Sequence, residues 1–380
     1  MALLTNEQEQ LRGNLREFVD KEILPNAAAV DESKVFPRNI FHRLGELGYL
    51  NLSFAFQHPN TRYTGTEGAI IIEEISRGLP SLGLSVSPHV QCMNLIAIAG
   101  QQTLQERLLR RCMSGEHLLG YALSETNSGS NALNINTAAV FDGENWILSG
   151  EKSWITNLGA ADGYVVAARS ITSQRSRDIS LFYIDADTPG LSDDDRKELV
   201  GLNNSPLGTL RMKNCVVPAD CLIGRENEDY GLMKIGLDEG RYNMAAVALG
   251  LAEGALETAV ETTKNSSIYG RSLYTYQGVS FRAASMYEKV FVARNSLYTV
   301  AEMLASGRKA SMEIAATKLF TTEMACEVAK DAAQLCGAYG YARSSPTERY
   351  LRDAQALTIS EGSSEVCKVV ISNKLFRSEE

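Results

Sequence analysis

The spacing of hydrophobic positions changes twice along the chain, and the changes predict three domains. Up to about residue 120, apolar residues recur every three or four positions, as at Leu11, Leu15 and Phe18, which is the spacing of one helix face. Residues 121–228 instead hold short β-like runs such as GYVVAAR, ISLFYID, TLRM and NCVVP, separated by turn residues. From residue 229 the helical spacing returns in long stretches.

This order predicts a mainly α fold with a central β domain. We expect an N-terminal helical domain over 1–120, a middle β domain of barrel or sandwich type over 121–228, and a C-terminal four-helix bundle over 229–380. Two apolar stripes indicate long helices of the bundle. Their residues are Ala245, Leu249, Ala252, Leu256 and Val260 in the first stripe and Ala316, Phe320, Met324, Val328, Ala332 and Leu335 in the second.

Composition and charge restrict the partners. The 380 residues carry a formal net charge of −9 at pH 7, so a nucleic-acid partner is not expected. The sequence contains no run of about 18 apolar residues, so no membrane span is expected. Residues 1–23 have the pattern of an acidic amphipathic helix rather than of a signal or transit peptide, so we expect a mature cytoplasmic protein.

The cysteines and histidines do not suggest a metal site. The seven cysteines form no CxxC pair, and their odd number and scatter favour buried, reduced thiols. The four histidines show no ligand spacing such as HExxH. A zinc site or a Ser-His-Asp hydrolase is therefore poorly supported, and we predict no metal.

Two polar segments of the middle domain suggest a wall for a flat cofactor. SETNSGS (124–130) offers hydroxyls and a backbone freed by Gly129, which can hydrogen-bond an extended ligand. In WITN (154–157), Trp154 offers a flat ring, and Thr156 points to the same face of a strand. A ring that covers a heterocycle beside a hydroxyl that bonds its edge fits a flavin. The alternative is an ordinary polar turn and a core tryptophan.

A third segment, LTISEGSSEV (357–366), supplies a candidate base. Glu361 is followed by Gly362, so the chain is expected to turn there between helices. A carboxylate buried beside an acyl chain would have a raised pKa and could remove a weakly acidic C–H proton. The alternative is a solvated Glu361, with Ser363 or Ser364 capping the next helix. QLCGAYG (334–340) has a similar alternative, a plain helix C-cap.

In this order, the segments resemble the acyl-CoA dehydrogenase family over nearly the whole chain. YALSETNSGSN is similar to the family's flavin-binding YxxTEPxAGSD pattern and KSWITN to its KxWITN strand, and YLRDA and ISEGSSEV follow in the expected order. The resemblance implies a FAD enzyme that desaturates an acyl thioester between its α and β carbons. It also implies that Glu361 takes the α-proton and that flavin N5 accepts the β-hydride.

The resemblance further implies the binding residues. FAD contacts fall on Tyr121, Leu123, Ser124, Ser130, Trp154, Thr156, Gln277, Gln334, Gly337, Ala338, Ser363 and Glu365, some of them across a subunit interface. Substrate contacts fall on Ser130, Asp238, Arg241 and Gly362, with Asp238 and Arg241 at the pantetheine arm. The backbone N–H of Glu361, together with a ribityl hydroxyl of the flavin, would polarise the thioester carbonyl.

Some relatives place their base one residue before the arginine of the LDxxR helix. This chain has Gly240 there, which cannot serve as a base. The adjacent Glu239 would point about 100° away from position 240 on a helix. The resemblance therefore favours Glu361 as the base.

Departures from the family pattern suggest a specialised branch. Ser266 stands where the family often has an arginine for the FAD phosphates, which leaves Arg271 as a substitute, and Ala338 replaces a second glycine. EGRYN, GAYG and EGSS look most like relatives that act on carrier-protein-linked acyl groups in natural-product biosynthesis. Weak recognition of the nucleotide part of CoA would follow, because a carrier protein has no such part.

The implied partners are an acyl thioester, on CoA or an acyl carrier protein, and an electron-transfer flavoprotein or a similar acceptor. FAD contacts from two subunits imply a homotetramer or homodimer. Two alternatives stay open: an oxidase that reduces oxygen directly, and a catalytically silent FAD-binding homologue with an assembly role.

Overall fold

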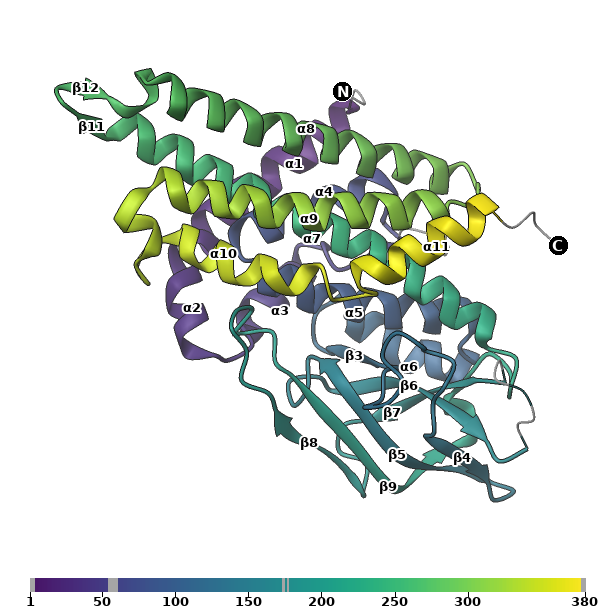
Figure 1. Ribbon diagram of the computed structural model, residues 1–380. Coiled ribbons are helices and arrows are strands. Elements are labelled where there is room, and N and C mark those ends of the chain that lie inside the picture. The colour runs from purple at the N-terminus through teal and green to yellow at the C-terminus, as the bar shows by residue number, and fades with distance from the viewer. Residues whose placement is uncertain (1–3, 54–60, 173–174, 176–177, 377–380) are drawn as a thin grey trace.

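The computed structural model describes residues 4–53, 61–172, 175 and 178–376, and its N-terminal part is helical (Figure 1). Helix α1 begins at a capping box in which Thr5 and Gln8 each accept from the other's backbone N–H. A π-helical turn, η1 (Val19–Ile23), follows it. The helices of this part are α1 (Asn6–Phe18), α2 (Ala27–Ser33), α3 (Arg38–Glu46), α4 (Thr66–Gly78), α5 (Pro80–Ala99) and α6 (Gln102–Met113).

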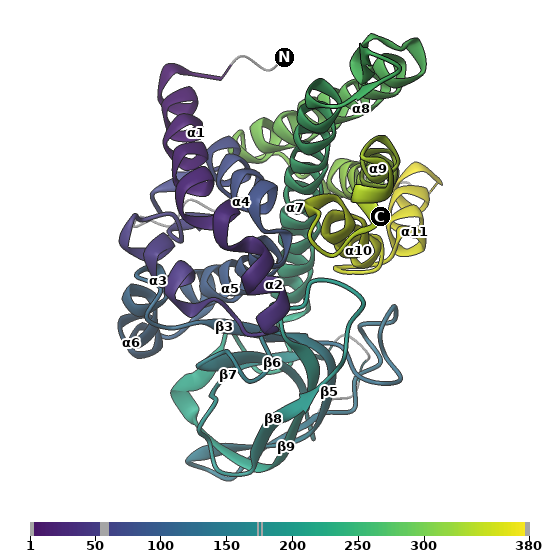
Figure 2. The ribbon, with the colours of Figure 1, turned by 90° about the vertical axis from the view of Figure 1, so that its left-hand side faces the viewer.

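The middle of the chain forms a sheet of eight strands, counted over the described residues, which lies below the helices in both ribbon views (Figures 1 and 2). The strand order is β10-β7-β6-β4-β5-β9-β8, and β3 pairs with β6 in parallel. The strands are β3 (Leu119–Ala122), β4 (Ala138–Phe141), β5 (Asn145–Thr156), β6 (Gly163–Ser170), β7 (Ser180–Asp185), β8 (Leu191–Arg196), β9 (Leu207–Pro218) and β10 (Leu222–Ile223).

The C-terminal part returns to helices, so the predicted fold class is confirmed. Its helices are α7 (Tyr230–Asn265), α8 (Gln277–Ala305), α9 (Ser311–Leu335), α10 (Pro346–Leu357) and α11 (Ser364–Phe376). Two small strand pairs complete the fold, β1 (Leu52–Ser53) with β2 (Tyr63–Thr64) and β11 (Ser267–Ile268) with β12 (Arg271–Ser272). The β11–β12 hairpin links α7 to α8 at the far end from the sheet (Figure 1).

Helix α5 joins the two hydrophobic cores. Leu82, Val86 and Val90 pack into the helical core, whereas Leu95 and Ile96 belong to the core under the sheet. The helix lies against both α7 and β3 (Figure 2). Within the described residues α5 alone has the length and composition of a membrane span, but 83% of its apolar window is buried inside the protein. Its apolar surface is therefore core surface on nearly every side.

Some sequence-based expectations need correction. The second bundle stripe holds from Met324 onwards, but Ala316 and Phe320 are exposed, and the buried face of α9 there runs through Ile314 and Thr321. The runs TLRM and NCVVP form one continuous strand, β9, rather than two. Strand β8 was not predicted, because its acidic sequence LSDDDR carries no apolar alternation on the sheet edge. All seven cysteines are free, and six of them are buried.

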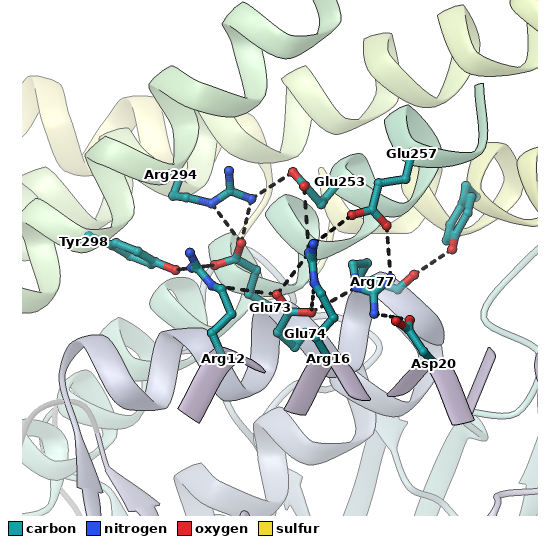
Figure 3. A network of polar contacts seen from close by, with 11 residues as sticks. Arg12, Arg16, Asp20, Glu73, Glu74, Arg77, Glu253, Glu257, Arg294 and Tyr298 are labelled. Carbon is teal, nitrogen blue, oxygen red and sulfur yellow. Dashed lines mark hydrogen bonds and ion pairs between the residues drawn. The ribbon is translucent and has the colours of Figure 1, made fainter. Parts of the chain in front are cut away.

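A buried charge network joins the N-terminal helices to the C-terminal ones (Figure 3). Glu73 on α4 accepts hydrogen bonds from Arg294 at 2.7 Å and from the Tyr298 hydroxyl at 2.6 Å, both on α8. Arg294 also pairs with Glu253 on α7 at 2.8 Å. Burial alone would raise the pKa of Glu73, but Arg294, Arg12 and the Tyr298 hydroxyl outweigh it and hold that pKa low.

A second set of pairs continues the network along α1 and α4 (Figure 3). Arg16 on α1 lies 3.2 Å from Glu74, and Arg77 lies 2.9 Å from the same carboxylate. Arg77 also reaches Glu257 on α7 at 3.0 Å and Asp20 in η1 at 2.5 Å. Because these groups come from η1 and four helices, the network fixes how the N-terminal helices dock on α7 and α8.

We predict that Glu73→Gln destabilises the protein by roughly 3 kcal/mol, because it leaves the buried Arg294 without its closest carboxylate. Urea denaturation followed by circular dichroism measures the change. The matched control is Glu17→Gln, which breaks the exposed Glu17–Lys21 pair and should leave the midpoint in place. Equal midpoints for the two variants would show that the network adds nothing to the docking of these helices.

Candidate active site

Glu361 lies in the turn between α10 and α11, in a left-handed conformation with φ of 54°. For a residue with a side chain this conformation costs about 1 kcal/mol, so the surroundings must hold it. The buried Lys318 of α9 donates to the carbonyl oxygens of Gly362 at 2.8 Å and Thr358 at 3.3 Å. These two carbonyls bracket Glu361, so one ammonium group ties both sides of the turn to the core.

The Glu361 carboxylate points between α5 and α7. The Gln91 side-chain amide donates to Glu361 Oε2 at 3.4 Å and to the Gly236 carbonyl at 2.9 Å. A Cβ at position 240 would overlap both the Gln91 amide and the Glu361 carboxylate. A side chain at position 240 and the Glu361 carboxylate would therefore occupy the same space, and Gly240 keeps that space free for the carboxylate.

The surroundings make Glu361 a stronger base than an exposed glutamate. Burial raises its pKa, and the Gln91 hydrogen bond and the charges of Arg241 and Lys318 oppose the shift only in part. The turn itself has the predicted cap, since Ser363 Oγ accepts from the backbone N–H of Val366 at 3.4 Å. Glu361 is half-buried rather than fully solvated, and Ser363 caps the following helix as the alternative expected.

Arg241 and Asp238 lie beside this turn. The Arg241 guanidinium pairs with Asp238 Oδ1 at 2.7 Å, and Asp238 Oδ2 accepts from the Ser311 hydroxyl. Arg241 Nε is buried and has no hydrogen-bond partner among the described residues, and it would lie 3.5 Å from a Cβ on Gly362. The structure thus brings Asp238, Arg241, Gly362 and Glu361 into one cluster.

Strand β3 connects this cluster to the predicted flavin wall. Tyr121 is buried, and its hydroxyl would lie 3.6 Å from a Cβ on Gly236, whose carbonyl oxygen accepts from the same Gln91 amide that bonds Glu361. Burial raises the pKa of Tyr121, and the charges of Cys92 and Glu361 add to the shift. The preceding residue, Gly120, would place a Cβ 3.1 Å from the carbonyl oxygen of Thr156. The carboxylate turn and the end of β5 therefore approach β3 at consecutive residues.

Trp154 is not a core residue. Its side chain is 62% exposed on β5, whereas the chain's other tryptophan, Trp146, is 4% exposed in the sheet core. Trp154 has φ of 63°, and the pairing of β5 with β9 shifts register beside it. Ile155 is buried between the exposed Trp154 and the half-buried Thr156. The core alternative for Trp154 is wrong, and its ring is available to cover a flat ligand.

A buried ion pair links the two segments of the wall. Lys152 Nζ lies 2.9 Å from Glu125 Oε1 and donates to the Leu123 carbonyl at 3.0 Å. Burial lowers the pKa of Lys152 to about 8, with Glu125 acting against the shift. Glu125 also accepts from the backbone N–H groups of Asn136 and Thr137. SETNSGS and WITN are thus fixed to each other from behind.

Four of the other predicted FAD residues do not gather at this wall within one chain. Gln277, Gln334, Gly337 and Ala338 are exposed at the start of α8 and just around the end of α9, away from the sheet (Figure 1). Arg271 stacks over the Tyr276 ring in the same region, at 4.9 Å. The remaining predicted contacts differ in exposure: Leu123 is buried, Ser124 and Ser363 are half-buried, and Ser130 and Glu365 are exposed.

Two residues of the site were missed at the level of sequence. Gln91 and Lys318 are buried polar side chains whose helix faces also bury other polar residues, and each reaches the Glu361 turn. Residue type alone did not set them apart, and only the fold shows that both faces meet the same turn. No group of three or more His, Cys, Asp or Glu side chains within the described residues could hold a metal ion.

Comparison with known proteins gives the family. The chain matches the acyl-CoA dehydrogenase N-terminal domain over residues 5–116, the middle domain over 120–215 and the C-terminal domain over 230–376. It is 34% identical to the short-chain specific acyl-CoA dehydrogenase of Clostridium acetobutylicum, over 98% of this chain and 99% of that protein.

Solved structures agree with the sequence relatives. Butyryl-CoA dehydrogenase from Megasphaera elsdenii superposes with a TM-score of 0.92 at 28% identity, covering 99% of this chain and 100% of that one. A chain from the structure described as "Electron transferring flavoprotein of Acidaminococcus fermentans" gives a TM-score of 0.95 at 32% identity, covering all of both chains.

Members of this family use FAD, and the residues present fit it. An exposed indole ring, the half-buried Thr156 hydroxyl and a polar turn locked in place by Glu125 and Lys152 are suited to a flat heterocycle with a polar tail. The chain therefore belongs to the acyl-CoA dehydrogenase family of FAD-dependent oxidoreductases that act on CH–CH groups.

Proposed function

We propose that this protein desaturates an acyl thioester between Cα and Cβ, with Glu361 as the base that takes the α-proton. The observation that carries the proposal is the half-buried Glu361 carboxylate, which has a raised pKa and is held by Gln91 from the side and by Lys318 through the backbone. A base of raised pKa is better matched to abstraction of a weakly acidic proton near neutral pH.

The chain's own residues would orient and polarise the substrate. The backbone N–H of Glu361 donates to the thioester carbonyl, which makes the α-hydrogen acidic enough to leave. Asp238 and Arg241, already paired beside Gly362, hold the pantetheine arm. Trp154, Thr156 and the SETNSGS turn hold the flavin. When bound, FAD supplies the acceptor for the β-hydride.

We predict that the Glu361→Gln variant keeps its bound flavin but that substrate no longer reduces this flavin. The amide fills the same space but cannot accept the proton. Anaerobic mixing with short acyl thioesters, followed at the flavin absorbance band, measures the rate. A reduction rate equal to that of the wild type would show that Glu361 is not the base.

The same assay on the wild-type protein, with each acyl group offered on CoA and on a carrier protein, tests the proposed carrier-protein branch. If the protein belongs to that branch, we expect faster flavin reduction with the carrier protein.

We predict that the rate of flavin reduction by substrate depends on pH through the raised pKa of Glu361. The base works only when deprotonated, so the rate falls as pH drops through that pKa, at a pH above the ordinary value of 4.5. The rate measured against pH checks this expectation. A wild-type rate that stays level below pH 4.5 would contradict it.

We predict that Lys318→Met lowers kcat/KM by about a hundredfold, because small displacements of a base have large effects on rate. Loss of the ammonium charge also raises the pKa of Glu361 further, so the acid limb of the pH profile moves to higher pH. A purely structural role would not move that limb. Lys330→Met, at an exposed position on the same helix, is the matched control and should leave both quantities unchanged.

We also propose a homo-oligomer, dimer or tetramer, that receives electrons on FAD and passes them to an electron-transfer flavoprotein in the cytoplasm. Gln277 at the start of α8 and Gln334 near the end of α9 are exposed, and these helix ends lie away from the sheet that carries Trp154, which supports FAD contacts from a second chain (Figure 1). The exposed side chains of Phe281, Tyr287 and Tyr341 give the same helical part an apolar surface suited to a protein–protein interface. Light scattering that finds a monomer with bound FAD, or rapid peroxide formation without an added acceptor, would contradict this part.

A further inference from the structure

We infer that the acyl group is short and carries a hydrogen-bond donor close to the reacting carbons, rather than being a plain alkyl chain. The inference rests on the proposed function, because it takes Glu361 as the point where the α-carbon must lie. It is carried by a run of buried polar side chains along the seam between α5 and α7, directly beside that carboxylate.

The seam is an antiparallel contact between two helix faces. Gln91 on α5 bonds the Gly236 carbonyl of α7, whereas Gly83 faces Val247 at the other end of the contact. Ser87 and Asn94 lie four residues before and three residues after Gln91, so they share its face of α5. Asn94 in turn donates to Glu239 on α7, three residues after Gly236.

Several polar atoms in this seam have no hydrogen-bond partner within the described part of the chain. They are Gln91 Oε1, Ser87 Oγ and both side-chain polar atoms of Asn243. Gln91, Ser87 and Asn243 are all completely buried. Buried polar groups of native proteins are normally hydrogen-bonded, and Gln91 also bonds the Glu361 carboxylate, so its unpartnered Oε1 indicates a polar group supplied by the ligand.

The orientation of Gln91 decides what the ligand must offer. Both neighbours of its amide nitrogen, the Gly236 carbonyl and the Glu361 carboxylate, are acceptors, so the NH₂ group must face them. Oε1 is then left as a fixed acceptor, and it calls for an O–H or N–H donor on the acyl group. An alkyl chain in this place would bury Oε1 without compensation.

The seam also limits the length of the acyl group. Gly236 and Gly240 allow α7 to approach α5 closely: a Cβ on Gly236 would lie 3.3 Å from Leu95, and one on Gly240 would overlap Gln91. Leu95 closes the seam beyond Gln91 on the sheet side. Such a close approach of the two helices leaves less room for a fatty chain than for a group of a few heavy atoms.

The test compares matched thioesters on one carrier at a time, either CoA or a carrier protein. The probes are butyryl, 4-hydroxybutyryl and 4-methoxybutyryl thioesters, of which only the hydroxyl can donate. Glu361→Gln protein with bound FAD reports binding without turnover, through the shift of the flavin spectrum. We expect 4-hydroxybutyryl to bind at least roughly tenfold more tightly than the other two, as for one hydrogen bond to a buried acceptor.

Combining Glu361→Gln with Gln91→Leu should reduce that ratio to about one while the flavin stays bound. Gln91→Met repeats the test with a side chain of similar length. Equal or tighter binding of butyryl, a ratio that survives loss of Gln91, or no binding of any thioester would overturn the inference. Failure of the proposed function looks different: the wild-type flavin would stay oxidised with every thioester while the binding ratio persisted.

Discussion

The close approach of α5 to its neighbours is the constraint on which the rest of the structure depends. One end of this helix packs into the core shared with α4 and α7, and its other end packs under the sheet. Because protein interiors are close-packed, a helix common to two cores transmits its position to both. Gln91 stands at the point where one core gives way to the other, and it contacts Glu361. The base is therefore positioned by the same packing that joins the helical and β parts.

The fold class could be predicted from the sequence because the period of the apolar residues differs between the parts. Long stripes such as Ala245 to Val260 leave little choice of secondary structure. The failures have physical causes. Strand β8 is stabilised by pairing with β9 at a sheet edge, and this pairing leaves no trace in its acidic sequence. On α9 the buried face includes Thr317, Lys318 and Thr321, so a search for apolar residues alone chose a face turned by part of a helical turn.

The site was partly predictable for a related reason. Glu361, Trp154 and Arg241 lie in segments whose order resembles a known family, and residue types alone carry that likeness. Gln91 and Lys318 could not be found in this way, because their importance comes from partners 270 and 44 residues away in sequence. The Glu125–Lys152 pair belongs to both kinds: its residues lie inside recognised segments, but their contact depends on how strand β5 meets the turn after β3.

Gly240 has a consequence for how this family can change. Since a side chain there would overlap the Glu361 carboxylate, a chain that held carboxylates at both positions would have to rebuild the turn or α7. Moving the proton acceptor from one helix segment to the other cannot then proceed by adding the new group first and deleting the old one later. Unless such rebuilding comes first, the order of substitutions passes through a chain with neither carboxylate in place. That chain would lack the proton acceptor on which the proposed reaction depends.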